Sequence, residues 1–242
     1  QNFKEVLNIF HVAWEKGVRS FDTAPGYNTE KSIGHFLKLN GLTNKAKIFT
    51  KLPNINSSLK FEDRIKYFIN NSLKNLNVSK IEVLFFHDPK NIKFIEKNKN
   101  FFLKLKKIFP IKNYGFSIYN LSEFNNAKKI NLTRTFQVPY NLLNNEFVKN
   151  SKNYNFHARS IFFQGLLVSK KYNRRLKNNT LRKSHNSYLN YFKKLNIEPI
   201  DYNFEFLKRD NFFKSYLLGV DNIYQLEEFF KRFKKTYTFK KK

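Results

Sequence analysis

Four side chains that can exchange protons or hold charge lie near the ends of three consecutive apolar runs in this 242-residue sequence. Asp22 ends the first run and Tyr27 follows it by five residues, whereas Lys51 ends the second run and His87 directly follows the third. A carboxylate, a phenol, an ammonium group and an imidazole are suited to general acid–base chemistry. Taken singly, each of these residues could have a purely structural role, such as capping a helix or lying in solvent. Their placement together at consecutive strand ends argues against purely structural roles for all four.

The elements that position these residues alternate between short apolar runs and amphipathic segments. The runs predict strands at residues 18–22, 47–51, 81–86, 114–117, 135–138, 155–160 and 215–218. Helical periodicity predicts helices at 1–16, 29–39, 61–76, 92–109, 122–130, 144–151, from about 188 onward, at 199–207 and at 223–233, with a polar excursion or lid at about 170–187. This alternation implies parallel strands with right-handed crossovers.

The prolines favour a barrel over a doubly wound sheet. Each of four prolines follows, within three residues, a polar side chain at a predicted strand end: Pro25, Pro53, Pro89 and Pro139. In a barrel these ends converge on one mouth, where active sites are built. No G-x-G-x-x-G follows an early strand, which argues against a Rossmann fold. We therefore expect an α/β (β/α)8 TIM barrel with seven readable strands, formed by residues 1–242 as a single domain.

Composition narrows the class of protein. With 41% hydrophobic residues the chain has enough apolar side chains for one large core, and no run approaches the roughly 18 apolar residues of a membrane span. Cysteine is absent, so disulfides, thiolate metal sites and cysteine nucleophiles are excluded. No signal peptide is visible at the start. A cytoplasmic setting fits these features.

The strong positive charge has two interpretations. The chain holds 46 Lys and Arg against 18 Asp and Glu, a net charge of +28. One interpretation is a basic nucleic-acid-binding module, which predicts binding to DNA or RNA that weakens steeply with salt. We favour a biased composition, because the lysines are spread along the predicted helices and only the tail, at about 231–242, is densely basic.

Longer motifs around the four residues resemble those of the aldo-keto reductase superfamily. The matching segments are F-D-T-A-P-G-Y at 21–27, T-K at 50–51, H-D-P at 87–89, G-F-S at 115–117, F-Q-V-P-Y-N-L-L at 136–143, A-R-S-I-F-F-Q-G-L-L at 158–167 and L-G-V-D-N-I-Y-Q-L-E-E at 218–228. They follow the family's order along essentially the whole chain. The resemblance implies a metal-independent oxidoreductase that uses NADPH or NADH to reduce the carbonyl of a small aldehyde or ketone, with sugars among the candidates.

The resemblance also implies a role for each of the four residues. Tyr27 would be the general acid that protonates the carbonyl oxygen. A phenol with an ordinary pKa of about 10 is a weak acid, and a neighbouring Lys51 ammonium would favour the phenolate and lower that pKa. Asp22 would hold Lys51 charged and in place. His87 would hydrogen-bond the carbonyl oxygen where negative charge develops.

A second set of residues is expected to hold the cofactor. By the resemblance, Ser117 and Gln137 would hold the nicotinamide carboxamide. The pyrophosphate path would be lined by Ser160, Phe162 and Gly165, and the adenosine end would be held by Gly219, Asn222, Gln225 and Glu228. Phosphate sites in barrels form after the last two strands, which agrees with this order.

The sequence departs from the family pattern at four places. Asn28 stands where glycine is usual, but asparagine tolerates a left-handed backbone. Phe229 replaces an asparagine and would remove one adenine contact. Asp221 lies near the position that faces a 2′-phosphate, and its carboxylate would favour NADH over NADPH. The family's first strand would precede residue 1, and the sequence starts without methionine, so we expect a barrel that is incomplete at its N-terminus.

Two questions stay open at the level of sequence. The expected substrate loops, at 54–59, 88–93 and 170–187, are polar and basic, which favours a sugar or an anionic carbonyl compound over a steroid-like one. The alternative to an active enzyme is a catalytically weak protein of the same fold that binds a nucleotide as a sensor or subunit. The incomplete barrel favours this alternative, whereas the four intact residues oppose it.

Overall fold

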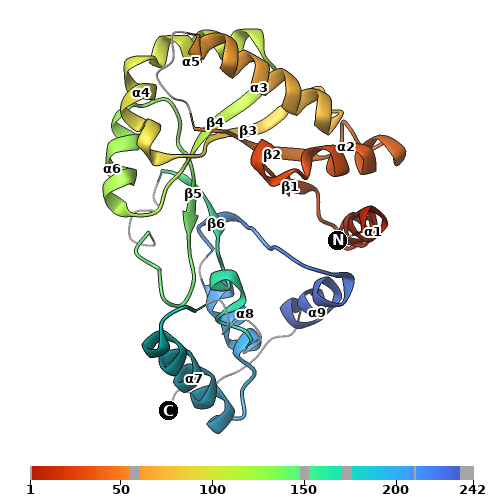
Figure 1. The fold of residues 1–242 in the computed structure, drawn as a ribbon, viewed down its shortest axis with the longest axis vertical. Coiled ribbons are helices and arrows are strands. Elements are labelled where there is room, and N and C mark those ends of the chain that lie inside the picture. The colour runs from red at the N-terminus through yellow and green to blue at the C-terminus, as the bar shows by residue number, and fades with distance from the viewer. Residues whose placement is uncertain (1, 55–59, 148–152, 170–175, 210, 235–242) are drawn as a thin grey trace.

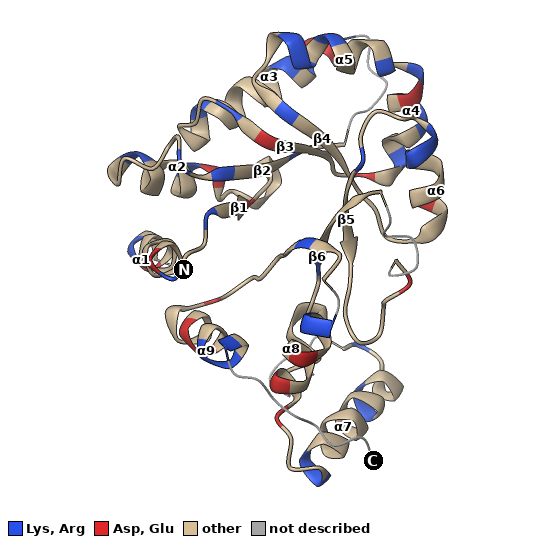
Figure 2. Cartoon of the chain, turned by 180° about the vertical axis from the view of Figure 1, so that it is seen from behind, with Lys and Arg blue, Asp and Glu red and all other residues tan. Residues whose placement is uncertain are grey.

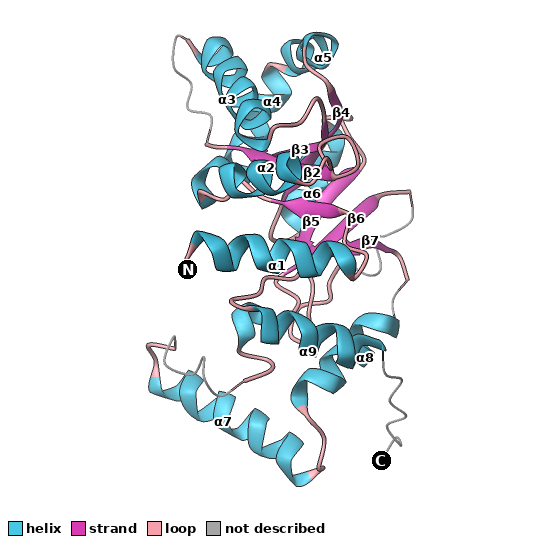
Figure 3. Cartoon of the chain, turned by 90° about the vertical axis from the view of Figure 1, so that its right-hand side faces the viewer, coloured by secondary structure: helices cyan, strands magenta, loops and turns pink. Residues whose placement is uncertain are grey.

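The computed structural model describes residues 2–54, 60–147, 153–169, 176–209 and 211–234. Its strands form one parallel seven-stranded sheet in sequence order. The strands are β1 (Ser20–Asp22), β2 (Lys47–Leu52), β3 (Ile81–Phe86), β4 (Ile111–Ser117), β5 (Thr135–Pro139), β6 (Asn155–Arg159) and β7 (Phe213–Tyr216). The sheet curls, and helices flank it in the manner of an incomplete (β/α)8 barrel, as predicted (Figure 1, Figure 3).

Helices follow the strands in the alternation expected from the sequence. They are α1 (Phe3–Glu15), α2 (Glu30–Leu39), α3 (Phe61–Leu76), α4 (Ile92–Lys97), α5 (Lys99–Ile108), α6 (Leu121–Lys129), α7 (Asn179–Lys194), α8 (Pro199–Arg209) and α9 (Ile223–Lys234). Most buried apolar side chains form one core between the central strands and these helices. Central strands such as β3 are buried along nearly their whole length, as expected of a parallel sheet that is covered on both of its faces.

Inside the curl, large rings fill the space between neighbouring strands. Phe85 of β3 stacks on Phe49 of β2 with ring centroids 6.4 Å apart, and His157 of β6 lies 5.3 Å from the same Phe49 ring. Gly115 on β4 makes room for this layer, because a Cβ there would lie 2.5 Å from the Phe85 ring. The absence of a side chain at Gly115 is therefore a packing requirement.

Three predicted helices differ from the structure. The helix expected from Tyr188 begins at Asn179, where the side chain of Asn178 accepts a hydrogen bond from the Thr180 amide, so half of the expected polar excursion is helical. The expected helix 92–109 divides at Asn98 into α4 and α5. The prediction of a helix at 144–151 is wrong for its described residues, 144–147, which are not helical. The Asn141 side chain accepts hydrogen bonds from the amides of Leu143 and Asn144 and turns the chain there. Residues 148–151 lie outside the described residues.

The first and last strands are joined by helices and not by a strand ladder. Among the described strands, no pairing links β7 to β1. Ile9 and Ala13 of α1 instead pack against Leu226 of α9, and the two helices lie side by side in Figure 1. A cavity of about 440 Å³ runs beneath this contact.

Basic residues are distributed over the molecule. Lys and Arg occur on the outer faces of most helices without gathering on one of them (Figure 2). Within the described residues, no helix has both the length and the apolar character needed to cross a membrane. Most of the predicted basic tail, residues 235–242, lies outside the described part of the chain.

Candidate active site

The parallel register brings the first three strand ends to one edge of the sheet. Asp22 is the last residue of β1, Lys51 lies next to last in β2, and His87 directly follows β3. Tyr27 ends a short 3₁₀ turn, Pro25–Tyr27, that follows β1. The next residue, Asn28, has φ 57° and closes this turn in the left-handed conformation, as expected where the family pattern has glycine.

Asp22 and Lys51 form an ion pair in which the lysine is almost wholly buried. Lys51 Nζ also donates to the Thr23 carbonyl over 3.0 Å, and Gln137 Nε2 donates to the second Asp22 oxygen over 2.7 Å. Burial lowers the pKa of Lys51, and the Asp22 carboxylate opposes that shift. Asp22 therefore stabilises the charged form of a lysine that burial alone would tend to neutralise.

Tyr27 and His87 face each other across the same edge. The Tyr27 hydroxyl lies 3.4 Å from His87 Nε2, and their rings are nearly perpendicular. Lys51 Nζ lies 5.0 Å from the centre of the Tyr27 ring. Burial lowers the pKa of His87, assisted by the positive charges of Lys51 and Arg159, so the imidazole is neutral near neutral pH. The structure thus brings all four predicted residues together.

The pKa of Tyr27 shifts in the opposite direction to the one expected from the sequence. We expected Lys51 to lower the pKa of Tyr27, but burial and the Asp22 carboxylate raise it, with Arg159 opposing them. The reason is orientation, because the Lys51 ammonium points to Asp22 and Thr23 and makes no hydrogen bond to the Tyr27 hydroxyl within the described residues. The phenol consequently keeps its proton at neutral pH.

Arg159 is a site residue that the sequence reasoning missed. It ends β6, and its guanidinium lies 4.2 Å from the centre of the Tyr119 ring. Its charge acts on Tyr27, Lys51 and His87 alike. The strand-end rule that identified the other residues applies equally here, since Arg159 occupies the corresponding position within A-R-S at 158–160.

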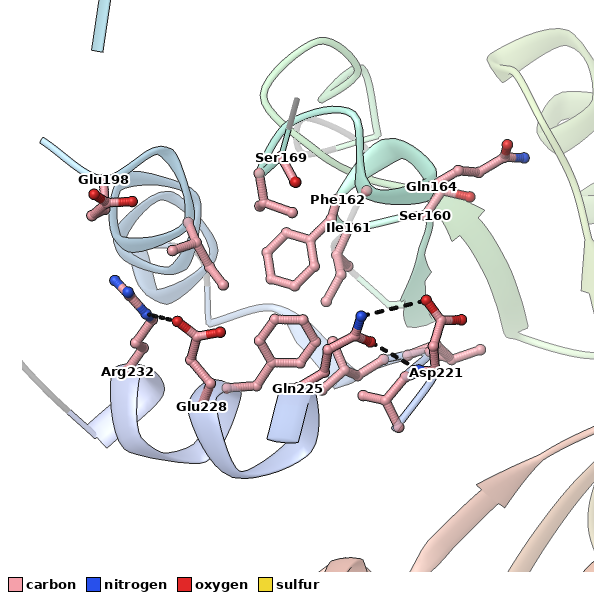
Figure 4. A pocket seen from close by; sticks show the side chains of 18 residues that line it. Ser160, Ile161, Phe162, Gln164, Ser169, Glu198, Asp221, Gln225, Glu228 and Arg232 are labelled. Atoms are coloured by element: carbon pink, nitrogen blue, oxygen red, sulfur yellow. Dashed lines mark hydrogen bonds and ion pairs between the residues drawn. The ribbon is translucent and has the colours of Figure 1, made fainter. Parts of the chain in front are cut away.

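Most of the expected cofactor residues line one cavity of about 550 Å³ beside the ends of β6 and β7 (Figure 4). The members are Ser160, Phe162, Gly165, Gly219, Gln225 and Glu228, together with Asp221. Asn222 does not line it, because its side chain caps α9 by accepting from the Gln225 amide over 2.9 Å. Ser117 and Gln137 are neighbours on β4 and β5, both buried, and Gln137 contacts Asp22.

Several acidic side chains line this cavity, among them Asp221 and Glu228. Asp221 and Gln225 hydrogen-bond each other, with the Asp221 amide 2.8 Å from Gln225 Oε1. Glu228 pairs with Arg232, which also binds Asp201. Figure 4 shows Asp221 and Glu228 on opposite sides of Gln225. Phe229, which replaces a polar residue of the family pattern, packs against Phe162 and Phe204 in the core.

The size and position of the cavity fit a dinucleotide. Pockets for small ligands typically hold about 300–1,000 Å³, and this cavity lies at strand ends beside the first turn of α9, where anions are favoured. Gly219 leaves open space on its side, because an added Cβ would meet no atom within 4 Å. Within the described residues, no group of three or more His, Asp or Glu side chains is arranged to hold a metal ion.

Comparisons with known proteins identify a family and agree with the fold. The sequence model of the Aldo/keto reductase family matches residues 1–241. Among curated proteins, no sequence matches. The glycerol dehydrogenase of Gluconobacter oxydans has a similar structure, with a TM-score of 0.70, 19% identity and coverage of 97% of this chain and 82% of that chain. A candidate aldo-keto reductase of Pseudomonas aeruginosa has a TM-score of 0.69, 17% identity and coverage of 96% and 83%.

Proposed function

This chain belongs to the aldo/keto reductase family of oxidoreductases, and on that premise we propose that it reduces the carbonyl group of a small aldehyde or ketone to an alcohol with NADH or NADPH. The observation that carries the proposal is the meeting of Asp22, Tyr27, Lys51 and His87 at one edge of the sheet. The cavity beside β6 and β7 supports it, because it offers a dinucleotide a place on the same side of the barrel.

In this proposal Tyr27 gives its proton to the substrate oxygen. The raised pKa keeps the hydroxyl protonated, so that the acid is present throughout the neutral range. The half-exposed phenol is accessible to a substrate. When the proton leaves, the phenolate gains attraction from the positive charge of Arg159. Lys51, whose Nζ lies 5.0 Å from the ring centre, is close enough to add to this attraction.

His87 orients the carbonyl group. Its Nε2 lies within reach of the Tyr27 hydroxyl, so an oxygen placed between them could contact both. A neutral imidazole donates a hydrogen bond without competing as an acid, and the lowered pKa keeps it neutral. Asp22 acts through Lys51, whose position and charge it fixes.

The cofactor would supply the hydride when bound. Ser117 and Gln137 would hold its carboxamide end, and the residues lining the cavity would hold the pyrophosphate and adenosine. Gln137 already donates to Asp22 through Nε2, which fixes its side chain and leaves Oε1 as the acceptor for a carboxamide. Asn222 would serve by capping α9 and so ordering the first turn beside the cavity.

We further propose that NADH is preferred over NADPH. Asp221, Glu228 and Glu198 line the cavity, and among the described lining residues Arg232 is the one cation and pairs with Glu228 and Asp201. A 2′-phosphate placed near these carboxylates would be repelled and lose affinity.

The proposal is tested by following the oxidation of NADH and of NADPH with aldoses, ketoses and simple aldehydes. Carbonyl-dependent oxidation, faster with NADH, is expected. Absence of oxidation with either cofactor on every compound would refute the proposed activity, and a strong preference for NADPH would refute the cofactor assignment alone.

A nucleotide-binding role without turnover is the second candidate. One observation favours it, namely that β1 and β7 are not paired among the described strands and leave a cavity of about 440 Å³ next to Asp22 and Gln137. The same assay separates the two candidates. Tight binding of NADH or NADPH, measured by quenching of protein fluorescence, without carbonyl-dependent oxidation would support the second.

A further inference from the structure

The turn that carries three of the expected cofactor residues has a strained backbone. This turn, residues 160–165, lies across the cavity from α9 (Figure 4), and we call it the cavity turn. Ser160, Phe163 and Gln164 have φ of 56°, 46° and 56°, in the left-handed region that residues other than glycine rarely adopt. Phe163 is bulky and nearly half exposed, so packing offsets little of its strain. Such a backbone persists only where its surroundings hold it.

Three side chains of α7 and α8, which we call the clamp, bind the two carbonyls that directly follow the cavity turn. His185 Nε2 lies 2.6 Å from the Leu166 carbonyl and carries the proton of this bond, because a carbonyl only accepts. The Tyr188 hydroxyl and Asn203 Nδ2 both donate to the Leu167 carbonyl, over 2.9 and 3.1 Å. Asn203 Nδ2 also donates to the Tyr188 hydroxyl over 3.2 Å, which links the two donors to each other.

The clamp and the carbonyls that it binds are buried. Asn203 is 1% exposed and His185 is 9% exposed. His185 Nδ1 has no partner among the described residues, so the bond to Leu166 is the one hydrogen bond that this ring makes there. Leu167 is buried as well, and without its donors its carbonyl would be left unsatisfied. The chain could then lower its free energy by moving Leu167 toward solvent and releasing the strained turn.

The clamp lies behind the wall of the cavity. Its three side chains are not among the described residues that line the cavity. Gly165 precedes the two bound carbonyls, Val168 and Ser169 follow them, and all three of these residues do line it. A shift of the bound carbonyls would therefore displace the cavity wall on both sides of them, so the clamp acts on a ligand through the backbone that it holds.

We propose that His185, Tyr188 and Asn203 are positioning residues that set the affinity of this cavity for a dinucleotide, because they keep the cavity turn in the shape that receives the pyrophosphate. This inference rests on the proposed function and adds to it the residues that preform the cofactor site. A preformed turn does not have to be ordered when the ligand binds. Loosening the clamp should therefore weaken cofactor binding and leave kcat at saturating cofactor nearly unchanged.

The test removes single donors of the clamp. Tyr188→Phe deletes one hydroxyl group, and His185→Leu deletes the donor to Leu166. Each variant should bind NADH about tenfold more weakly in a fluorescence titration, as expected for the loss of one buried hydrogen bond. The KM for NADH should rise while kcat stays nearly unchanged. His185→Gln offers an amide donor near the position of Nε2 and should restore most of the affinity.

Tyr114→Phe is the matched control. Tyr114 is a buried tyrosine whose hydroxyl also donates to a backbone carbonyl, that of Phe102 over 2.8 Å, but in the core between β4 and α5. This variant should lose stability in urea denaturation and keep the wild-type affinity for NADH. Equal weakening of NADH binding in Tyr114→Phe and Tyr188→Phe would show a general effect of lost stability and would overturn the inference.

Amide hydrogen exchange, followed by mass spectrometry without any nucleotide, measures the turn directly. Peptides that cover residues 160–169 should exchange faster in Tyr188→Phe and His185→Leu than in the wild type and in Tyr114→Phe. Unchanged exchange of these peptides in the two clamp variants would overturn the inference, whatever the activity of the protein.

The inference and the proposed activity can fail separately. Weaker NADH binding and faster exchange in the clamp variants of a protein that reduces no carbonyl would support the inference although the proposed activity has failed. Unchanged NADH binding in the clamp variants of an active enzyme would overturn the inference alone. A wild type that binds neither NADH nor NADPH would overturn both.

Discussion

The Asp22–Lys51 ion pair allows a stability prediction whose size follows from its burial. The Lys51 side chain is 2% exposed and the Asp22 side chain 19% exposed. Removing one partner of a buried pair leaves the other charge uncompensated and typically costs about 3–5 kcal/mol. Replacing both removes the two charges together and is often nearly neutral. The pair should therefore show strong coupling in a double-mutant cycle.

We expect Asp22→Asn to lower the free energy of unfolding by about 3 kcal/mol, at the low end of that range. The Thr23 carbonyl continues to accept from Lys51 Nζ in this variant and offsets part of the loss. Lys51→Met should cost less, about 1–2 kcal/mol, because Asp22 is partly solvated and keeps its hydrogen bond from Gln137. The double variant should recover most of the stability.

Urea denaturation of the wild type and the three variants near neutral pH, followed by circular dichroism, measures these values. Turnover is measured in parallel and should be lost in all three variants, including the stable double variant. Losses that simply add in the double variant would refute the argument, because they would mean that the two side chains act independently. Single losses of a few tenths of a kcal/mol, typical of exposed pairs, would refute the burial on which it depends.

Three further predictions follow from other parts of the structure. The kcat/KM for reduction should stay level at about pH 7–8, because burial lowers the pKa of His87 below its ordinary value and raises that of Tyr27 above its ordinary value; a midpoint within this range would contradict the assignment. Burial lowers the pKa of His157 to about 4. Between pH 6.5 and 4 this imidazole is therefore protonated in the unfolded chain and neutral in the folded chain. Stability should therefore fall by about 3 kcal/mol between pH 6.5 and 4, and His157→Phe, measured by urea denaturation across this range, should reduce that fall. Gly34→Ala should lower the free energy of unfolding by about 1–3 kcal/mol, because the added Cβ would lie 2.0 Å from the Asn75 carbonyl oxygen. This clash outweighs the higher helix propensity of alanine. Unchanged thermal unfolding would contradict the prediction and show that α2 can move away from α3.

The parts of the fold that depend on local patterns could be predicted from the sequence. Helix α3 (Phe61–Leu76) and strand β3 (Ile81–Phe86) have the bounds that periodicity gave them. Helix α7 begins earlier than predicted because its polar first half depends on distant contacts. His185 Nε2 lies 2.6 Å from the Leu166 carbonyl, and the Tyr188 hydroxyl donates to the Leu167 carbonyl over 2.9 Å. No local pattern reports such contacts.

The candidate site, like the fold, could be predicted from the sequence only in part. Strand-end positions identified Asp22, Lys51 and His87, because parallel register alone brings strand ends together. Side-chain orientation could not be predicted. The turning of Lys51 toward Thr23, the bond from Gln137 to Asp22 and the stacking of Arg159 on Tyr119 all depend on rotamers set by tertiary packing.

The central claim is that Tyr27 supplies the proton in a carbonyl reduction. The most direct measurement compares Tyr27→Phe with the wild type in two assays on the same preparation, cofactor binding by fluorescence and carbonyl-dependent oxidation of NADH or NADPH. Because Tyr27 is half exposed, its hydroxyl can be removed without disturbing the core. We predict unchanged cofactor affinity and a turnover reduced by about 10²–10⁴-fold. Turnover at the wild-type rate in Tyr27→Phe would contradict the account.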